Sequence, residues 1–174
     1  MIKLPVMSFD KYILRPVKEE DAYDYFEIGK DEETVKYLSW YAFKNVSEAF
    51  THFNYLYFSE NFSNDPQGYA IVDVETNKMI GVIDFHTFNK VLKTAHIGYL
   101  LHKDYWGLGI ITESLRLMTE VGFEHLNLRK IYIKSIKENL ASRRVCEKNN
   151  FKLANIRKID YYHKKTNTYH YVYK

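Results

Sequence analysis

Residues 95–123 change from the periodicity of a strand to that of a helix, and two glycines stand where the change occurs. Apolar side chains alternate from Ala95 to Leu101, which predicts a strand. Gly107 and Gly109 follow, and apolar residues then recur at helical spacing, at Ile111, Leu115, Met118, Val121 and Gly122. Glycine lets the backbone approach a ligand closely, and the first helical turn has N–H groups without an internal acceptor. This order of elements therefore favours a phosphate-binding site.

A glycine pair before a helix is a weak signal by itself, because an ordinary tight turn between a strand and a helix explains it equally well. Two better-defined phosphate motifs are excluded. The third glycine of a dinucleotide-binding fingerprint would fall at Thr112, and no Gly-Lys-Ser/Thr sequence follows to make a Walker A loop. The rest of the sequence has to decide between the turn and the phosphate site.

The composition is that of one globular domain, which we expect to span residues 1–174. Hydrophobic residues make up 46% of the chain and charged residues 27%, which excludes a disordered chain. The single cysteine, Cys146, excludes an intramolecular disulfide and fits a reducing compartment. No stretch approaches the roughly 20 apolar residues of a membrane span, and the first residues lack the apolar run of a signal peptide. We therefore expect a cytoplasmic protein without a membrane partner.

Charge is distributed unevenly along the chain, although the net charge of +3 is too small to predict a nucleic-acid partner. Residues 1–66 hold 7 Lys and Arg against 12 Asp and Glu, whereas residues 67–174 hold 18 against 10. An acidic front and a basic back would suit a cationic substrate on one side and a phosphate-bearing ligand on the other. Solvated surfaces without any partner explain the same numbers.

Hydrophobic periodicity and turn residues predict a mostly antiparallel α/β (α+β) domain with one β-α-β crossover. The strands are expected at residues 12–17, 69–74, 79–88, 95–101, 129–136, 151–162 and 168–173, with a turn at 164–167 between the last two. The helices are expected at about 22–28, 48–62 with Ser47 as N-cap, from Gly109 to about 123, and 139–149, with a helical turn near 34–38.

Two motifs stand about 30 residues apart in these elements. The first is Ile97-Gly98-Tyr99-Leu100 with Tyr105-Trp106-Gly107-Leu108-Gly109 and Thr112-Glu113. The second is Glu138-Asn139-x-Ala141-Ser142-x-x-Val145-x-Glu147-Lys148-x-x-Phe151. Together with Ile13-Leu14-Arg15-Pro16 and Gly81-Val82-Ile83, they resemble the GNAT superfamily of acetyl-CoA-dependent N-acetyltransferases. Within it the chain is most similar to the RimJ/RimL-like branch, which acetylates protein N-termini. The resemblance covers nearly the whole chain.

The resemblance implies a fold and a cofactor. The fold is a mixed, mostly antiparallel central sheet of about seven strands, splayed in the middle and flanked by about four helices. The cofactor is acetyl-CoA, with CoA as the product, and no metal is implied. Its arm would pair with the backbone of the strand that ends at Leu101, and its phosphates would bind the amides of the glycine turn. The residues implied to bind it are Tyr99, Leu100, Leu101, Tyr105, Trp106, Gly107, Leu108, Gly109, Ile110, Ile111 and Asn139.

Direct attack of a neutral amine on a thioester, in a ternary complex, needs a base and an acid. By resemblance Ser142 would protonate the leaving thiolate, although a hydroxyl bonded to its own helix explains this residue as well. Asp84 and His86 are the candidate bases, because they stand two apart and share one face of a strand. The alternative is two exposed polar residues. Asn139 would hold the cofactor arm, cap its helix, or do both.

Four positions depart from the family pattern. Asp104 stands where Gln or Arg is usual, so we expect the loop to bind phosphates through backbone amides. Ile111 replaces a small residue. Asn150 replaces a glycine, a mild change because asparagine is the best substitute for glycine in the left-handed conformation at a helix end. Cys146 replaces the tyrosine that serves many relatives as general acid, so that role cannot be carried over, and we expect a core cysteine there.

The resulting hypothesis is an N-acetyltransferase that acts on a protein N-terminal α-amine, such as that of a ribosomal protein. An α-amine has a pKa of about 7.7–8.0 and needs only a weak base, whereas a lysine amine has one near 10.4. A small acceptor (a polyamine, an aminoglycoside or an amino acid) stays open because the front half is acidic. A non-catalytic CoA-binding module stays open because of Asp104 and the missing tyrosine. The sequence leaves open the acceptor, the acid and base, and whether the chain forms a homodimer.

Overall fold

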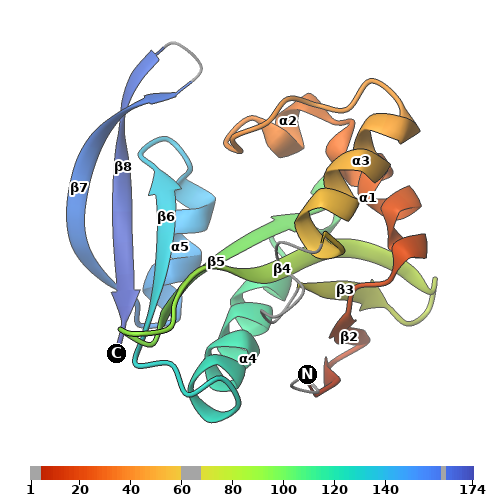
Figure 1. Cartoon of the computed structure of the whole chain (residues 1–174). Coiled ribbons are helices and arrows are strands. Elements are labelled where there is room, and N and C mark those ends of the chain that lie inside the picture. Colours follow the sequence, from red (N-terminus) through yellow and green to blue (C-terminus); the bar gives the residue numbers. More distant parts are fainter. Residues whose placement is uncertain (1–4, 60–67, 162–163) are drawn as a thin grey trace. The chain divides into compact units, whose positions relative to one another are not determined.

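The computed structural model describes residues 5–59, 68–161 and 164–174 (Figure 1). Its strands are β1 (Met7–Phe9), β2 (Tyr12–Pro16), β3 (Tyr69–Asp73), β4 (Lys78–Asn89), β5 (Thr94–Leu101), β6 (Lys130–Ile136), β7 (Lys152–Tyr161) and β8 (Lys164–Tyr173). Its α-helices are α1 (Ala22–Gly29), α2 (Glu32–Val35), α3 (Val46–Tyr57), α4 (Ile110–Glu124) and α5 (Leu140–Lys148), with short 3-10 helices η1 (Glu19–Asp21) and η3 (Lys103–Tyr105). None of these described helices is long and apolar enough to cross a membrane.

The described strands form a mixed sheet in the order β1-β2-β3-β4-β5-β6-β8-β7. Strand β5 pairs parallel with β6 across helix α4, and the pairs β1–β2, β2–β3, β3–β4, β6–β8 and β7–β8 are antiparallel. The parallel ladder holds three residue pairs, from Thr94 and Lys130 to His96 and Tyr132, so the later residues of both strands lie outside it. The predicted α/β class and central crossover are confirmed, with eight strands and five α-helices where about seven and about four were expected.

The chain divides into two compact units that each draw on two segments. Unit 1 holds Met1–Phe85 and Tyr99–Ile110, and unit 2 holds His86–Gly98 and Ile111–Lys174. Strands β4 and β5 therefore begin in one unit and end in the other. The single domain expected over residues 1–174 stays a prediction.

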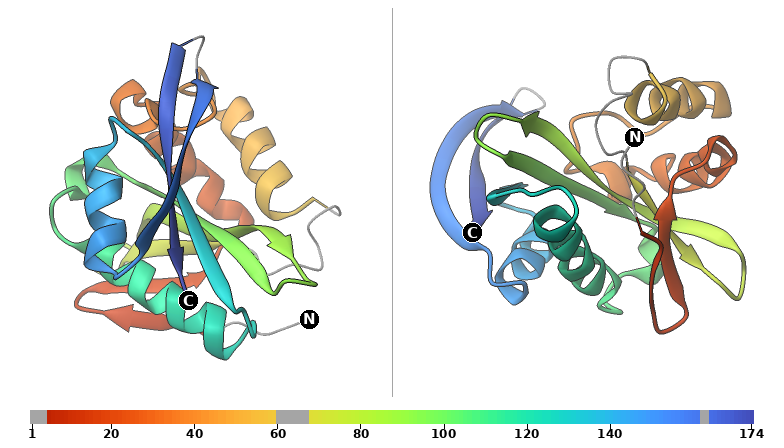
Figure 2. Two further views of the ribbon diagram at one scale, coloured as in Figure 1. Left: turned by 90° about the vertical axis from the view of Figure 1, so that its left-hand side faces the viewer. Right: turned by 60° about the horizontal axis from the view of Figure 1, so that its bottom comes forward.

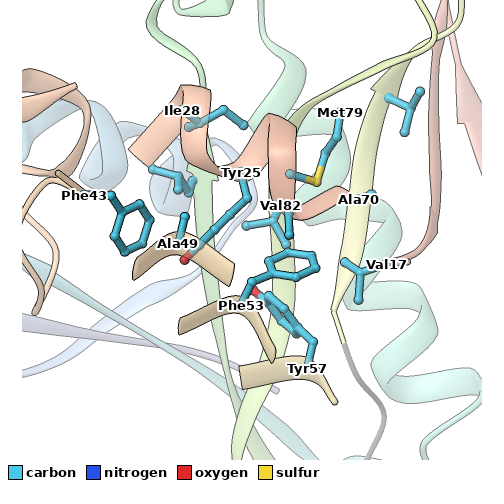
Figure 3. Close-up of a cluster of buried hydrophobic side chains, with 13 residues drawn as sticks. Val17, Tyr25, Ile28, Phe43, Ala49, Phe53, Tyr57, Ala70, Met79 and Val82 are labelled. Carbon is cyan, nitrogen blue, oxygen red and sulfur yellow. The ribbon is translucent and has the colours of Figure 1, made fainter. Parts of the chain in front are cut away.

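Aromatic residues form the core of unit 1, between helices α1 and α3 and strands β3 and β4 (Figure 3). Tyr25 and Phe53 are almost fully buried, with their ring centroids 5.0 Å apart, and Tyr57 follows Phe53 by one helical turn. The apolar stripes of both helices face this core because their buried residues recur three and four apart.

Helix α3 and strand β8 have other bounds than the sequence predicted. Helix α3 begins at Val46 rather than Glu48, because Asn45 and not Ser47 caps it: the Asn45 side chain accepts a hydrogen bond from the Glu48 amide at 3.0 Å. The helix also ends earlier than predicted: it stops at Tyr57 with Phe58 as its C-cap, whereas the prediction ran to Phe62, which lies outside the described residues. Strand β8 begins at Lys164, four residues before the predicted start, because the backbone predicted as a turn pairs with β7 instead.

Strands β6, β8 and β7 form the sheet of unit 2, with a long twisted β7–β8 hairpin at its edge (Figure 2). In β6 the residues Ile131, Ile133 and Ser135 are buried and alternate with more exposed ones. Helix α4 presents the predicted stripe of Leu115 and Met118 to the core, where both are fully buried. Side chains of β6 therefore alternate between a buried face of this sheet and a more exposed one.

Candidate functional site

The turn between β5 and α4 has the backbone conformation that only glycine adopts easily. Gly107 and Gly109 have φ angles of +78° and +80°, in the left-handed region that disfavours side chains. A Cβ atom built on either residue would meet nothing within 4 Å, so conformation and not lack of room demands glycine. Helix α4 starts at Ile110 and runs for 15 residues. Its first-turn N–H groups have no intrahelical acceptor and lie at the positive end of the helix dipole.

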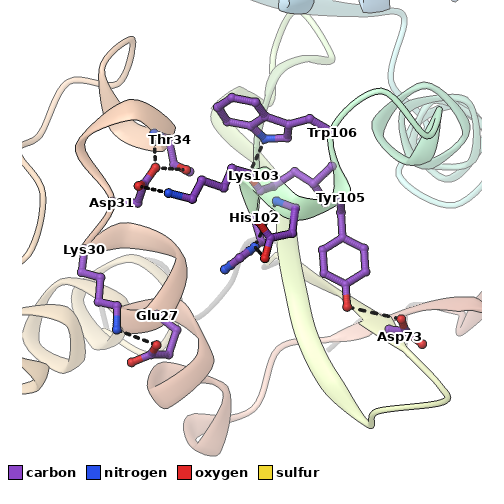
Figure 4. Close-up of polar contacts among 11 residues, drawn as sticks. Glu27, Lys30, Asp31, Thr34, Asp73, His102, Lys103, Tyr105 and Trp106 are labelled. Atoms are coloured by element: carbon purple, nitrogen blue, oxygen red, sulfur yellow. Dashed lines mark hydrogen bonds and ion pairs between the residues drawn. The ribbon is translucent and has the colours of Figure 1, made fainter.

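Hydrogen bonds from neighbouring residues of unit 1 hold this turn (Figure 4). The Trp106 Nε1 donates to the Leu101 carbonyl at 2.9 Å, and the Trp106 amide donates to the Lys103 carbonyl at 3.0 Å. The Tyr105 hydroxyl donates to Asp73 at 3.4 Å. The loop is therefore fixed in advance of any ligand, which lowers the entropy cost of binding.

The strand that leads into the turn is anchored by its side chains. Leu100 and Leu101 are 7% and 8% exposed, and Ile110 and Ile111, just beyond the turn, are also buried. Trp106 and Leu108 in the turn itself are exposed, at 44% and 63%. Of the residues predicted to bind the cofactor, the four buried ones offer a ligand only their backbone.

The cation beside the turn already has a carboxylate partner. Lys103 Nζ lies 2.6 Å from Asp31 Oδ1, and this contact, followed by the hydrogen bond from Thr34, lowers the pKa of Asp31 to about 2. The Asp104 side chain is exposed and lies 3.8 Å from His102 Nδ1. An anion in this loop would therefore depend on backbone amides rather than on a side-chain charge, as the sequence predicted from Asp104.

Asn139 caps helix α5 in unit 2, where its Oδ1 accepts a hydrogen bond from the Ser142 amide at 3.1 Å. The structure thus brings these two predicted residues together. Cys146 lies in the same helix, α5, and is fully buried, which confirms the predicted core cysteine. Asn150 has a φ angle of +62°, which confirms the left-handed residue expected after this helix.

Asp84 and His86, the predicted bases on β4, have different neighbours. Asp84 Oδ2 accepts a hydrogen bond from the Tyr57 hydroxyl at 3.0 Å within unit 1. The pKa of Tyr57 is raised by burial and, to a smaller extent, by Asp84, so Tyr57 stays protonated and orients the carboxylate. The His86 ring stacks on His96 in unit 2, with centroids 5.8 Å apart. The sequence did not predict Tyr57 or His96 as partners of these residues. The apolar stripe of α3 and the alternation of β5 show which element each belongs to, but not which residues of other elements it contacts.

Comparison with known families places these features in context. The family model described as an acetyltransferase (GNAT) domain matches residues 11–152. An uncharacterized N-acetyltransferase, p20 of Bacillus licheniformis, is 30% identical over 135 residues, which cover 76% of this chain and 74% of that protein. Spermidine N(1)-acetyltransferase of Escherichia coli (strain K12) is 27% identical over 126 residues, covering 72% and 64%.

The fold is also similar to that of solved acetyltransferase structures. A solved structure of RimL, a ribosomal L7/L12 alpha-N-protein acetyltransferase in complex with coenzyme A, superposes with a TM-score of 0.84 and covers 97% of both chains at 23% identity. At that identity the likeness concerns the fold alone. The left-handed glycines and the open first turn of α4 fit the diphosphate of CoA. The predicted family, enzyme class and acetyl-CoA cofactor are confirmed: this chain belongs to the acetyltransferase (GNAT) domain family and is an N-acetyltransferase.

Proposed function

We propose that this chain transfers the acetyl group of acetyl-CoA to the α-amine of a protein N-terminus, by direct attack in a ternary complex. The observation that carries the proposal is the left-handed glycine turn at the start of α4, in a chain of this family. Acetyl-CoA supplies an activated thioester carbonyl to the reaction. The chain's own residues have to hold it and move two protons.

The cofactor would be held mainly by backbone. The amides from Tyr105 to Ile111 would bind the diphosphate, since they include the first turn of α4 and two residues with room for close approach. The backbone of Tyr99–Leu101 would pair with the pantetheine arm, because its buried leucines fix the strand. The Asn139 amide group would bind the same arm while its oxygen caps α5.

Proton transfer would involve Ser142 as the acid toward the leaving thiolate and Asp84 or His86 as the base, directly or through water. Asp84 is the better oriented of the two because Tyr57 donates to it. An α-amine with a pKa of about 7.7–8.0 is already partly neutral near pH 7.5, so a weak base suffices. A lysine amine near 10.4 would need a stronger one. These roles remain proposals, as do a homodimer and a cytoplasmic location.

A small cationic amine is the second candidate acceptor. The spermidine N(1)-acetyltransferase among the relatives favours it, and so does an open surface pocket of about 520 Å³ in unit 1. That pocket is lined by Phe43, Ser47, Glu48, Thr51, His52 and Tyr55. Aromatic rings and a carboxylate are the groups that bind ammonium ions. The third alternative, a non-catalytic CoA-binding module, is disfavoured by the family.

Turnover with a panel of acceptors tests the proposal. Thiol release from acetyl-CoA would be followed with peptides that differ in their N-terminal residue, with the same peptides blocked at the α-amine, and with spermidine, an aminoglycoside and lysine. We expect kcat/KM to be highest for the free peptides and to vanish on blocking. A higher kcat/KM for spermidine would transfer the proposal to the second candidate, and CoA-induced thermal stabilisation without turnover of any acceptor would overturn both.

A further inference from the structure

The open pocket of unit 1 lies on helix α3 and has a mostly apolar lining. We call it the α3 pocket, and it is made by Phe43, Ser47, Glu48, Thr51, His52 and Tyr55. Aromatic rings pack together in its wall. Phe43 stacks on Trp40 with ring centroids 4.6 Å apart, and the His52 ring lies 5.0 Å from Trp40 and 5.5 Å from Phe43. A ligand with an apolar part would remove these surfaces from water, which favours its binding.

A buried hydrogen bond determines which nitrogen of His52 carries the hydrogen. Tyr25 is 2% exposed, its ring runs from α1 toward Phe43 (Figure 3), and its hydroxyl lies 3.1 Å from His52 Nδ1. Among the described residues, this nitrogen is the one acceptor within hydrogen-bond distance of the hydroxyl. A buried hydroxyl that does not donate is unfavourable, so Tyr25 donates to Nδ1 and His52 carries its own hydrogen on Nε2.

His52 therefore offers a neutral N–H donor in the wall of the pocket. Burial lowers the pKa of His52, so the ring is uncharged at pH 7. The residue is half-buried, and within the described part of the chain the Tyr25 hydroxyl is its one hydrogen-bond partner. The Nε2–H group is thus available to an acceptor oxygen, such as a carbonyl, of a ligand in the α3 pocket.

The carboxylate of the α3 pocket stabilises its own helix. Glu48 Oε2 accepts a hydrogen bond from the Lys44 amide at 2.9 Å, and Oε1 accepts one from Asn45 Nδ2 at 3.3 Å. This arrangement is a capping box, and the negative charge lies at the positive end of the helix dipole. An ammonium group would compete with these hydrogen bonds, and an anionic group would be repelled by Glu48. The polar groups of the pocket therefore suit a neutral ligand.

Helix α3 also connects the pocket with the proposed base, and all of these residues belong to unit 1. Tyr57, which donates to Asp84, follows His52 by five residues in α3, about 7.5 Å along the helix axis. An extended polypeptide advances about 3.3–3.5 Å per residue. A chain whose α-amine lies at Asp84 therefore reaches the level of the pocket with its second to fourth residues.

We propose that the α3 pocket binds an apolar side chain among the second to fourth residues of the acceptor polypeptide, while His52 Nε2 donates to a neighbouring peptide carbonyl. The inference rests on the proposed function and narrows its acceptor class. His52 and the aromatic wall then select the acceptor and take no part in proton transfer. A polypeptide supplies both the apolar group and the carbonyl, whereas a polyamine supplies neither a carbonyl nor an uncharged group at physiological pH.

Steady-state kinetics with matched peptides tests the selectivity. The peptides begin with serine and continue with alanine, except that leucine or asparagine, which are similar in size, stands at the second, third or fourth position. We expect one of the three positions to give a kcat/KM about tenfold higher for leucine than for asparagine, through KM and not kcat. Thr51→Trp, which fills the pocket, should reduce this ratio below twofold.

Asn54→Trp is the matched control, because Asn54 is an exposed residue of the same helix outside the α3 pocket. It should keep the leucine preference, and both variants should melt like the wild type. Equal losses of selectivity in the two variants would overturn the inference.

The imidazole nitrogen signals of His52 give a second readout that does not need turnover, with His52→Gln used to assign them. We expect the free protein to show the hydrogen on Nε2. With CoA bound, the acetylated leucine peptide should shift the Nε2 signal, and the acetylated asparagine peptide at the same concentration should not. A shift caused by spermidine at lower concentrations than by the leucine peptide would overturn the inference in favour of a cationic ligand.

The two assays separate this inference from the proposed function. Turnover of every peptide with the same kcat/KM and unchanged His52 signals would overturn the inference and leave the proposed function standing. Absence of turnover with every peptide would overturn the proposed function and, with it, the role of the α3 pocket in acceptor selection.

Discussion

The two units differ in how they present positive charge. Unit 1 holds nine Lys and Arg against sixteen Asp and Glu, a formal charge of −7, whereas unit 2 holds sixteen against six, a formal charge of +10. Yet it is the acidic unit that contains the glycine turn expected to bind a diphosphate. There the positive end of a helix and its unpaired amides attract an anion in place of side chains.

Charge pairing explains the contrast. In unit 1 several cations have carboxylate partners: Arg15 forms two 2.7 Å hydrogen bonds with Asp21, and Lys103 lies 2.6 Å from Asp31. In unit 2, Lys134 has no such partner among the described side chains. An anion bound to unit 1 should therefore depend on backbone conformation, and one bound to unit 2 on side-chain charge. The following substitutions test that difference.

The largest effect is expected at the glycine turn. In Gly107→Asp a side chain is forced into a left-handed conformation and a negative charge faces the diphosphate, so CoA should bind about 100-fold or more weakly, about 3 kcal/mol. The measurement is the rise in Tm on adding CoA, which the variant should lose. Asp104→Asn is the control, and its CoA affinity should stay within twofold of the wild type. A rise of more than twofold in the CoA affinity of Asp104→Asn, which removes a negative charge beside the turn, would mean that side-chain charge matters in unit 1 after all.

The paired charges of unit 1 should matter for stability. Asp21→Ala leaves the partly buried Arg15 without its partner and removes the acceptor of the Lys18 amide, so we expect the free energy of unfolding to fall by about 3 kcal/mol. Glu113→Ala, which breaks an exposed pair with Arg116 on α4, should cost less than about 0.5 kcal/mol. Urea unfolding measures both, and equal losses would contradict the distinction between buried and surface pairs.

A pH effect should come from unit 2. Burial, then Lys134, His86 and His170, lower the pKa of His96 to about 4, so between pH 6.5 and 4 the unfolded state binds more protons and stability falls as the pH falls. From pH 7 to pH 5 the free energy of unfolding of the wild type should fall by about 1 kcal/mol more than that of His96→Gln. This is roughly half of what the full pKa shift would give, because the ring is partly exposed and solvent screens its charge. Urea unfolding at both pH values measures this, and identical losses would show that His96 is not held neutral.

The smallest effect is expected at the surface pair beside the turn. Lys103→Gln breaks an ion pair with Asp31 that solvent screens, so stability should change by less than about 0.5 kcal/mol and the KM for acetyl-CoA by less than twofold. Steady-state kinetics and thermal melting check these values. A tenfold rise in KM would assign Lys103 to the cofactor and break the contrast between the units.

Local patterns in the sequence were enough to predict most elements of the fold. The central strand, glycine turn and helix have strong periodicity and occur within a residue or two of the predicted ends. The three-residue strand β1 was missed, because so short a segment has no periodicity and forms by pairing with β2. The start of β8 was missed because its first residues are polar and turn-like, and only pairing with β7 makes them a strand.

The candidate site was predictable where it is contiguous in sequence. The turn from Tyr105 to Gly109 and the capping of α5 by Asn139 depend on local backbone geometry, which residue types reveal. The contact of Asp84 with Tyr57 joins residues 27 apart in the sequence, and the pairing of Lys134 with His170 depends on the register between β6 and β8. No pattern in one strand shows what will stand opposite it.

The central claim is that the glycine turn of unit 1 accepts the diphosphate of an acyl carrier. Isothermal titration of the folded wild type with CoA and with acetyl-CoA tests it most directly. We predict one site per chain for each ligand, with a Kd between about 1 μM and 1 mM, the range usual for enzyme substrates. The titrations are made at two temperatures, because the binding enthalpy can pass through zero at one of them. The absence of binding heat with both ligands at both temperatures would contradict the account.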